Sequence, residues 1–213
     1  MRILLLCHAF NSLTQRLFVE LNEQGFEISV EFDINDETSE QAVNLFQPDL
    51  IIAPYLKREI PQSIWKKTIC LIVHPGIIGD RGPSSLDWAI LNELDEWGVT
   101  VLQANSEMDA GDIWASVNFP MRAASKASLY RNEVTEAAIE AVHLAVKKFR
   151  QLDSSPLPLN RAQAKGQWQA PIQQNDRAID WDKDSTDTIL KKIRSADGYP
   201  GVKQVLFERE IFL

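Results

Sequence analysis

Short apolar runs alternate with segments of helical spacing along the first 149 residues. A continuous run such as Leu50 to Ala53 is typical of a strand buried on both faces of a sheet. Leu13, Leu17 and Leu21 instead share one face of a helix. Strands are predicted at residues 2–7, 26–32, 50–53, 69–73, 99–103 and 113–119. Helices are predicted at 39–46, 60–67, 128–149 and 185–195. Two further helices are predicted by their end signals: one begins at Leu13 and ends at Gly25, and the other begins at a cap, Ser84 or Ser85, and ends at Gly98.

This alternation predicts an α/β fold with a mostly parallel twisted sheet and helices on both faces, as in Rossmann-like proteins. Such sheets bind ligands beyond the carboxyl ends of their strands. His74 directly follows the predicted strand at 69–73, and Asp109 lies in a loop beyond the strand at 99–103. A helix and a returning strand fit between them. We therefore expect both loops at the same edge of the sheet.

The composition changes after Leu152 and predicts three parts. Residues 1–152 form the main α/β domain. Residues 153–180, rich in Pro, Gln, Asn and Ser, are expected to be an extended linker. Residues 181–213 begin a C-terminal subdomain, in which 202–213 resembles a strand. The apolar end at Leu213 has no obvious partner strand, so the natural protein is expected to continue.

The charge of the chain argues against nucleic acid as its main partner, because 22 Lys and Arg face 30 Asp and Glu. Cys7 and Cys70 lie in predicted strands, where they are expected to be small buried hydrophobes. No cysteine or histidine spacing predicts a metal site. The N-terminus lacks the pattern of a signal peptide, and no apolar run has membrane-spanning length. We expect a cytoplasmic protein with small-molecule substrates and no membrane contact.

His74 and Asp109 are the residues with the most evident chemistry. An imidazole at the end of a buried strand is accessible to a ligand, and a nearby carboxylate can fix its tautomer. Such a pair suits acyl-type transfer, in which a proton moves from the nucleophile to a leaving amine. Judged by spacing alone, a loop histidine with one structural hydrogen bond is the more common alternative.

Several further motifs follow His74 in a fixed order: Arg81-Gly82-Pro83, Trp88-Ala89-Ile90, Gly98-Val99-Thr100 and Met108-Asp109-Ala110-Gly111-Asp112. Together with His74 they resemble the formyltransferase domain family, which includes enzymes acting on methionyl-tRNA, glycinamide ribonucleotide and nucleotide sugars. The resemblance covers about residues 1–151. It implies a formyltetrahydrofolate-dependent formyltransferase with His74 and Asp109 as catalytic residues.

Three segments carry a closer resemblance, to the N-terminal half of a hydrogenase-maturation protein: residues 8–16 (HAFNSLTQR), 74–90 (HPGIIGDRGPSSLDWAI) and 193–201 (IRSADGYPG). In that protein an enoyl-CoA-hydratase-like domain follows. The resemblance implies formyl transfer to coenzyme A during maturation of a nickel–iron hydrogenase. N-formylation of a nucleotide sugar or methionyl-tRNA is the alternative within the enzyme class. A catalytically inert folate-binding module is the alternative outside it.

The resemblance also implies binding residues. Ile72 stands where the family has an asparagine and cannot donate a hydrogen bond, so Gln15 is a candidate replacement. Arg131 and Arg194 are expected to meet phosphates of the acceptor or the folate glutamate, although exposed helix arginines are as common. The residues implied for folate are Leu56, Lys57, Ile60, Ile78, Gly79, Asp80, Arg81 and Gly82.

Overall fold

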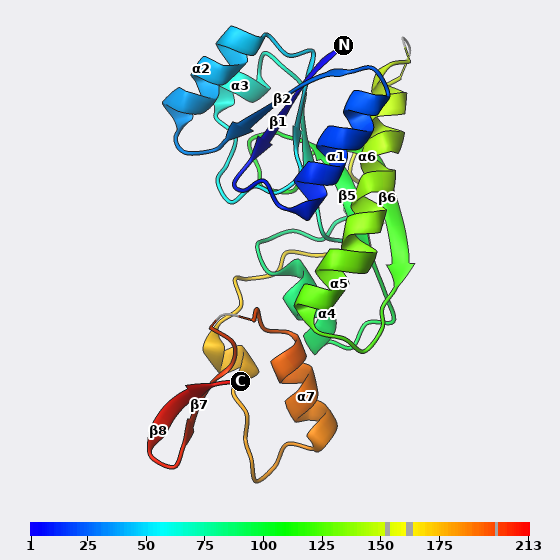
Figure 1. Cartoon of the computed structure of the whole chain (residues 1–213). Coiled ribbons are helices and arrows are strands. Elements are labelled where there is room, and N and C mark those ends of the chain that lie inside the picture. Colours follow the sequence, from blue (N-terminus) through cyan, green and yellow to red (C-terminus); the bar gives the residue numbers. More distant parts are fainter. Residues whose placement is uncertain (152–153, 161–163, 199) are drawn as a thin grey trace.

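The computed structural model describes residues 1–151, 154–160, 164–198 and 200–213 (Figure 1). The predicted boundary at 152–153 and Tyr199 of the quoted motif lie outside these residues. The main sheet has six strands in the order β2-β1-β3-β4-β5-β6. Its strands are β1 (Arg2–Cys7), β2 (Glu27–Phe32), β3 (Leu50–Ala53), β4 (Cys70–His74), β5 (Glu96–Gln103) and β6 (Ile113–Pro120).

The predicted α/β class is confirmed. The helices are α1 (Ser12–Glu23), α2 (Asp36–Phe46), α3 (Gln62–Trp65), α4 (Ser85–Leu91), α5 (Lys126–Leu129), α6 (Thr135–Phe149) and α7 (Thr186–Arg194), with a π-helical turn (Tyr130–Val134) between α5 and α6. The first two helices have asparagine caps: Asn11 Oδ1 accepts from Thr14 N at 3.0 Å, and Asn35 Oδ1 from Thr38 N at 2.8 Å. Because Asn35 caps α2, that helix begins three residues earlier than the apolar pattern predicts.

The fifth strand runs against its neighbours. β1 to β4 are parallel, whereas β5 pairs antiparallel with both β4 and β6, so that His74 lies opposite Thr100. The helix before β5 ends at Leu91, and Gly98 lies inside the strand. The prediction that Gly98 ends this helix is wrong. Seven helical residues span only about 10 Å, which does not carry the chain back along β4.

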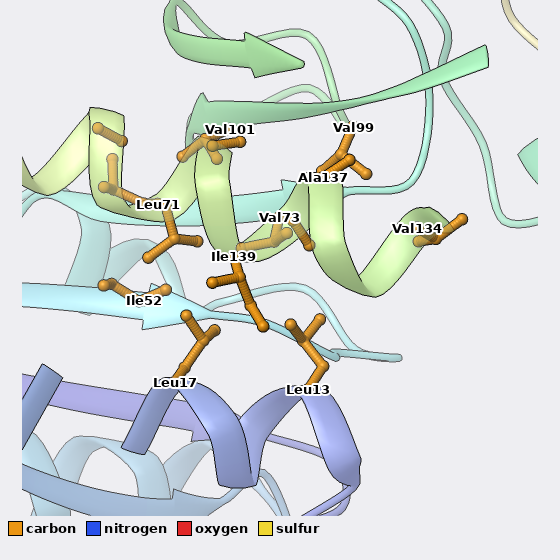
Figure 2. Close-up of a cluster of buried hydrophobic side chains, with 14 of the residues drawn as sticks. Leu13, Leu17, Ile52, Leu71, Val73, Val99, Val101, Val134, Ala137 and Ile139 are labelled. Atoms are coloured by element: carbon orange, nitrogen blue, oxygen red, sulfur yellow. The ribbon is translucent and has the colours of Figure 1, made fainter. Parts of the chain in front are cut away.

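Alternate strand residues divide the core into two layers. Ile3, Leu5 and Leu71 face α1 and α6, which lie side by side on one side of the sheet (Figures 1 and 2). Leu4, Leu6 and Ile51 face α2 and α3 on the other side, where Ile72 packs at the margin. The alternation follows from the two-residue period of a strand.

Both cysteines lie in this core, as predicted. Cys7 is 0% and Cys70 1% exposed. Burial raises the pKa of Cys70 to about 12 and also raises the pKa of Cys7. Neither thiol is a thiolate at neutral pH, so their role is packing.

The C-terminal residues form α7 and a separate hairpin of β7 (Lys203–Leu206) and β8 (Arg209–Phe212). The backbones of Val202 and Leu213 exchange hydrogen bonds of 2.9 and 3.0 Å. The expectation that the apolar end lacks a partner strand is therefore wrong. The predicted single strand turns back at Phe207 and Glu208, whose φ angles are positive.

Described residues of the segment predicted as a linker contact the sheet domain at several places, two of which are isolated β-bridges. Leu157 pairs with Ile113, and Trp168 with Arg81. The division of the chain at 153–180 stays a prediction. Within the described ranges, no helix combines the length and the apolar character that a membrane crossing requires.

Candidate active site

His74 is the last residue of β4, and its imidazole lies between two carboxylates. The ring Nδ1 is 3.5 Å from Asp109 Oδ2, and Nε2 is 2.8 Å from Asp80 Oδ2. Only 4% of His74 is exposed. The structure thus brings together the two residues that the sequence predicted as a catalytic pair, and it adds a third.

Asp109 reaches His74 by a route other than the predicted one. Because β5 is antiparallel, its end lies beside the start of β4, where Ala104 N donates to Cys70 O at 2.8 Å. The hairpin loop 104–112 must then fold back along β4 by about 13 Å, four residues at the rise of a strand. The prediction that the loops of His74 and Asp109 leave the same edge of the sheet is therefore wrong. The two side chains meet because the 104–112 loop folds back.

Contacts with the loop after β4 hold the tip of the 104–112 loop. Gly82 N donates to Asp109 Oδ2 at 3.2 Å, and Arg81 pairs with Glu107. Asp109 has φ +51°, a left-handed conformation that aspartate tolerates better than most residues. This conformation turns the carboxylate towards the histidine.

A cavity of about 1410 Å³ opens in front of this pair. His74 and Asp109 line it, with Ile72 beside them. Of the residues implied for folate, Leu56, Lys57, Ile60 and Gly82 line the cavity. Arg131 lines it from the π-helical turn.

Other predicted site residues lie outside the cavity lining. Gln15 is exposed, and its Nε2 donates to Phe10 O at 2.8 Å, so in this structure it does not take the place of the missing asparagine. Arg194 is the last residue of α7 and is not part of the lining. The remaining such residues are Ile78, Gly79, Asp80 and Arg81.

Three side chains lie near the pair in roles that the sequence did not predict. Asp80, expected at the folate, instead contacts His74. Ser85 Oγ lies 3.3 Å from His74 Nε2 and donates to Gly82 O at 3.1 Å. Tyr130 lines the cavity from the π-helical turn, and burial raises its pKa to about 12, so it remains a hydrogen-bond donor at neutral pH. The glycine-rich spacing between His74 and Asp80 is the one sequence signal for the first of these.

An ion cluster around the buried Asp87 lines the cavity. Lys126 Nζ lies 2.9 Å from Asp87 Oδ2 and 3.0 Å from Asp197 Oδ1. Burial raises the pKa of Asp87, which Lys126 and Arg177 only partly offset. The cluster connects α4 and α5 to the C-terminal residues.

This arrangement is suited to moving a proton. A carboxylate only accepts hydrogen bonds, so each ring nitrogen of His74 has an acceptor in reach when it carries a proton. Asp109 faces the cavity, whereas Asp80 lies behind the ring. A reacting group in the cavity therefore meets Asp109 and His74 together.

Residues 16–146 match the formyl transferase family, and the chain belongs to that family. Over its full length the chain is 54% identical to the hydrogenase maturation factor HoxX of Bradyrhizobium diazoefficiens. The solved structure of HypX from Aquifex aeolicus in complex with tetrahydrofolic acid superimposes with a TM-score of 0.93, at 48% identity over 99% of the chain. The chain spans only 38% of the HoxX protein and 36% of the HypX chain.

More distant relatives share the fold. Methionyl-tRNA formyltransferase from Clostridium thermocellum superimposes with a TM-score of 0.74 at 18% identity, covering 99% of this chain and 90% of that one. At this level of identity the similarity concerns the fold alone.

Proposed function

We propose that this chain transfers a formyl group from formyltetrahydrofolate to an acceptor, and that the acceptor is coenzyme A. The observation that carries the proposal is that His74 and Asp109 meet in one cavity of about 1410 Å³. A pocket for one small molecule measures about 300–1,000 Å³. The cavity therefore has room for a donor and an acceptor at the same time.

Two observations support folate as the formyl donor: apolar residues in the cavity lining and the ligand of a related structure. Leu56 and Ile60 give the cavity apolar surface on the side of β3, which suits a flat pterin ring. Tetrahydrofolic acid is bound in the HypX structure that this chain matches at 48% identity. Both observations support the folate donor.

The acceptor half rests on charge. Arg131 lines the cavity and is exposed there. A guanidinium binds phosphate groups bidentately, so Arg131 suits the phosphates of coenzyme A. Arg131→Ala should raise the KM for coenzyme A with the KM for folate unchanged. Arg122→Ala is the matched control, because Arg122 pairs with Glu133 outside the cavity lining.

In the proposed reaction the acceptor sulfur bonds to the formyl carbon, and the bond between that carbon and the folate nitrogen breaks. His74 and Asp109 take up the thiol proton and return it to the leaving nitrogen. Formyl-coenzyme A and tetrahydrofolate are the products.

The setting of the reaction is also a proposal. The name of the HoxX relative and its greater length support a role in hydrogenase maturation, with an enoyl-CoA-hydratase-like domain acting on the product. A cytoplasmic location and the lack of a nucleic-acid partner stay predictions.

The test supplies formyltetrahydrofolate, radiolabelled in the formyl group, with coenzyme A, with an amino sugar nucleotide, with methionyl-tRNA, or with no acceptor. We expect labelled formyl-coenzyme A, and none from His74→Ala. Label found on the amino sugar nucleotide or on methionyl-tRNA would show that the acceptor is an amine and not coenzyme A. Label released only as formate would indicate a hydrolase. Tight folate binding without turnover would overturn the enzymatic proposal and favour an inert module.

A further inference from the structure

Asp80 is tied to His74 more closely than Asp109 is. Its Oδ2 lies 2.8 Å from His74 Nε2, against 3.5 Å between Asp109 Oδ2 and Nδ1. Asp80 is 2% exposed and lies outside the cavity lining, so it touches the ring from behind. It is therefore placed to act on the histidine and not on a ligand.

Burial of Asp80 is unfavourable for the free energy of folding because of its second carboxylate oxygen, Oδ1. Among the residues that the structure describes, Asp80 Oδ1 has no hydrogen-bond partner. A buried, half-satisfied carboxylate is unfavourable for folding, and such groups call for a functional explanation. The hydrogen bond to His74 is the one contact of Asp80 with an evident chemical use.

The space between His74 and Asp80 excludes any other side chain. A Cβ at Gly76 would lie 2.3 Å from Asp80 Oδ2 and 2.5 Å from His74 Nε2. A residue larger than glycine would separate the imidazole from the carboxylate. Gly76 is thus required for the contact and not only for the turn after β4.

The segment predicted as a linker holds the loop that carries Asp80. Gly166 N donates to Ile78 O at 3.1 Å, Arg81 N to Gln167 O at 3.2 Å, and Gln169 N to Arg81 O at 2.8 Å. These bonds flank Asp80 on both sides. The approach is so close that a Cβ at Gly166 would lie 2.0 Å from Asp80 N.

We infer that Asp80 is a positioning residue for His74, and that backbone contacts from residues 166–169 hold it in place. The inference rests on the proposed function, in which His74 handles the proton. Asp80 accepts the Nε2 hydrogen, which fixes the tautomer and the ring plane and directs Nδ1 towards Asp109. Ser85 cannot substitute for it, because its hydroxyl is neutral and already donates to Gly82 O.

The kinetic test uses the full 213-residue chain with Asp80→Ala, Asp80→Asn and Gly166→Ala. Asp112→Asn and Gly198→Ala are the matched controls, since Asp112 is exposed and a Cβ at Gly198 meets nothing within 4 Å. We expect kcat to fall about tenfold or more in the three variants, with the KM for folate unchanged. A rise in KM with kcat unchanged would place Asp80 at the ligand and overturn the inference.

A second readout does not depend on activity. The chain has three histidines, so the ring nitrogens of His74 can be assigned by ¹⁵N NMR. We expect a proton on Nε2 that exchanges slowly in the wild type and rapidly in Asp80→Ala and Gly166→Ala. An unchanged signal in folded Asp80→Ala would overturn the role of Asp80, and one in Gly166→Ala would overturn the role of the segment. Because the spectrum needs no substrate, a failure of the proposed formyl transfer is distinguished from a failure of this inference.

Discussion

Asp109 Oδ2 lies 3.5 Å from His74 Nδ1, although the strand that leads towards Asp109 runs away from His74. The contact depends on the 104–112 loop, which folds back along β4 and is held by Gly82 N. The geometry of the pair is therefore a property of a loop, whereas the position of His74 is a property of the sheet.

The first prediction separates the charge of Asp109 from its backbone conformation. Asp109→Asn can keep both φ +51° and the acceptor for Gly82 N, so we expect normal stability and loss of formyl transfer. Asp109→Ala should lose activity and also about 1–2 kcal/mol in the free energy of unfolding, because alanine tolerates a left-handed conformation poorly. Denaturant unfolding and the formyl-transfer assay measure the two effects.

Asp109→Gly is the matched control for that prediction. Glycine adopts the left-handed region freely, so this variant should regain stability relative to Asp109→Ala without regaining activity. Equal stabilities of the alanine and glycine variants would show that the loop relaxes to another conformation. Wild-type activity in the asparagine variant would remove Asp109 from the mechanism.

Ile72 is the subject of the second prediction. It lines the cavity two residues before His74, at the position where the resembled family has an asparagine. Ile72→Asn adds an N–H donor there, and an oxyanion donor is typically worth about a hundredfold in rate. We expect Ile72→Asn to release formate faster in the absence of an acceptor, and Ile72→Val to behave as the wild type.

The measurement for Ile72 is formate release from formyltetrahydrofolate, followed together with thermal stability. A folded Ile72→Asn variant with wild-type hydrolysis would show that the tetrahedral oxygen is not formed next to residue 72. Ile72→Val is the control for side-chain volume, since it removes one methylene without adding a polar group.

The sequence predicted the elements better than their directions. Leu50 to Ala53 forms a strand with the predicted ends, as is typical of a short apolar run buried on both faces of a sheet. The reversal of β5 was not predictable from periodicity, since an apolar run is equally compatible with either strand direction. It depends on where α4 ends, and the chain continues past Leu91 without a proline or glycine until Gly98.

In the site, too, the sequence predicted which residues matter better than where they lie. His74 could be singled out because it directly follows a predicted buried strand and because the motifs after it resemble those of the formyltransferase family. Asp80 could be named but not placed, since its position depends on the backbone of Gly166, which lies far downstream of it in the sequence. Long-range backbone approach leaves no periodic signal.

The third prediction concerns the thiols. Cys7 and Cys70 are buried, and burial raises both pKa values. A thiol-specific reagent should therefore modify neither cysteine in the native chain at about pH 8 or below, and both after unfolding in urea. The number of modified thiols and the rate of modification test this. Rapid reaction of one thiol in the native protein would show that its strand opens locally.

The last prediction is a pH dependence that originates at Asp87. Burial raises its pKa above the ordinary value of 3.8, more than Lys126 and Arg177 lower it. Between 3.8 and the raised pKa, the folded chain binds a proton that the unfolded chain has lost. Its contribution to the free energy of unfolding is therefore present at low pH and is lost as pH rises through the folded pKa.

Asp87→Asn removes this titration. The free energy of unfolding of the variant minus that of the wild type should then rise as the pH increases between the two pKa values, with a slope of about 1.4 kcal/mol per pH unit. Urea titrations at several pH values above 3.8 measure the difference, with Asp112→Asn as the exposed control. A difference that falls with pH would mean that Lys126 and Arg177 stabilise the ionised carboxylate more than burial destabilises it. The cluster between α4, α5 and Asp197 would then be a net source of stability at neutral pH.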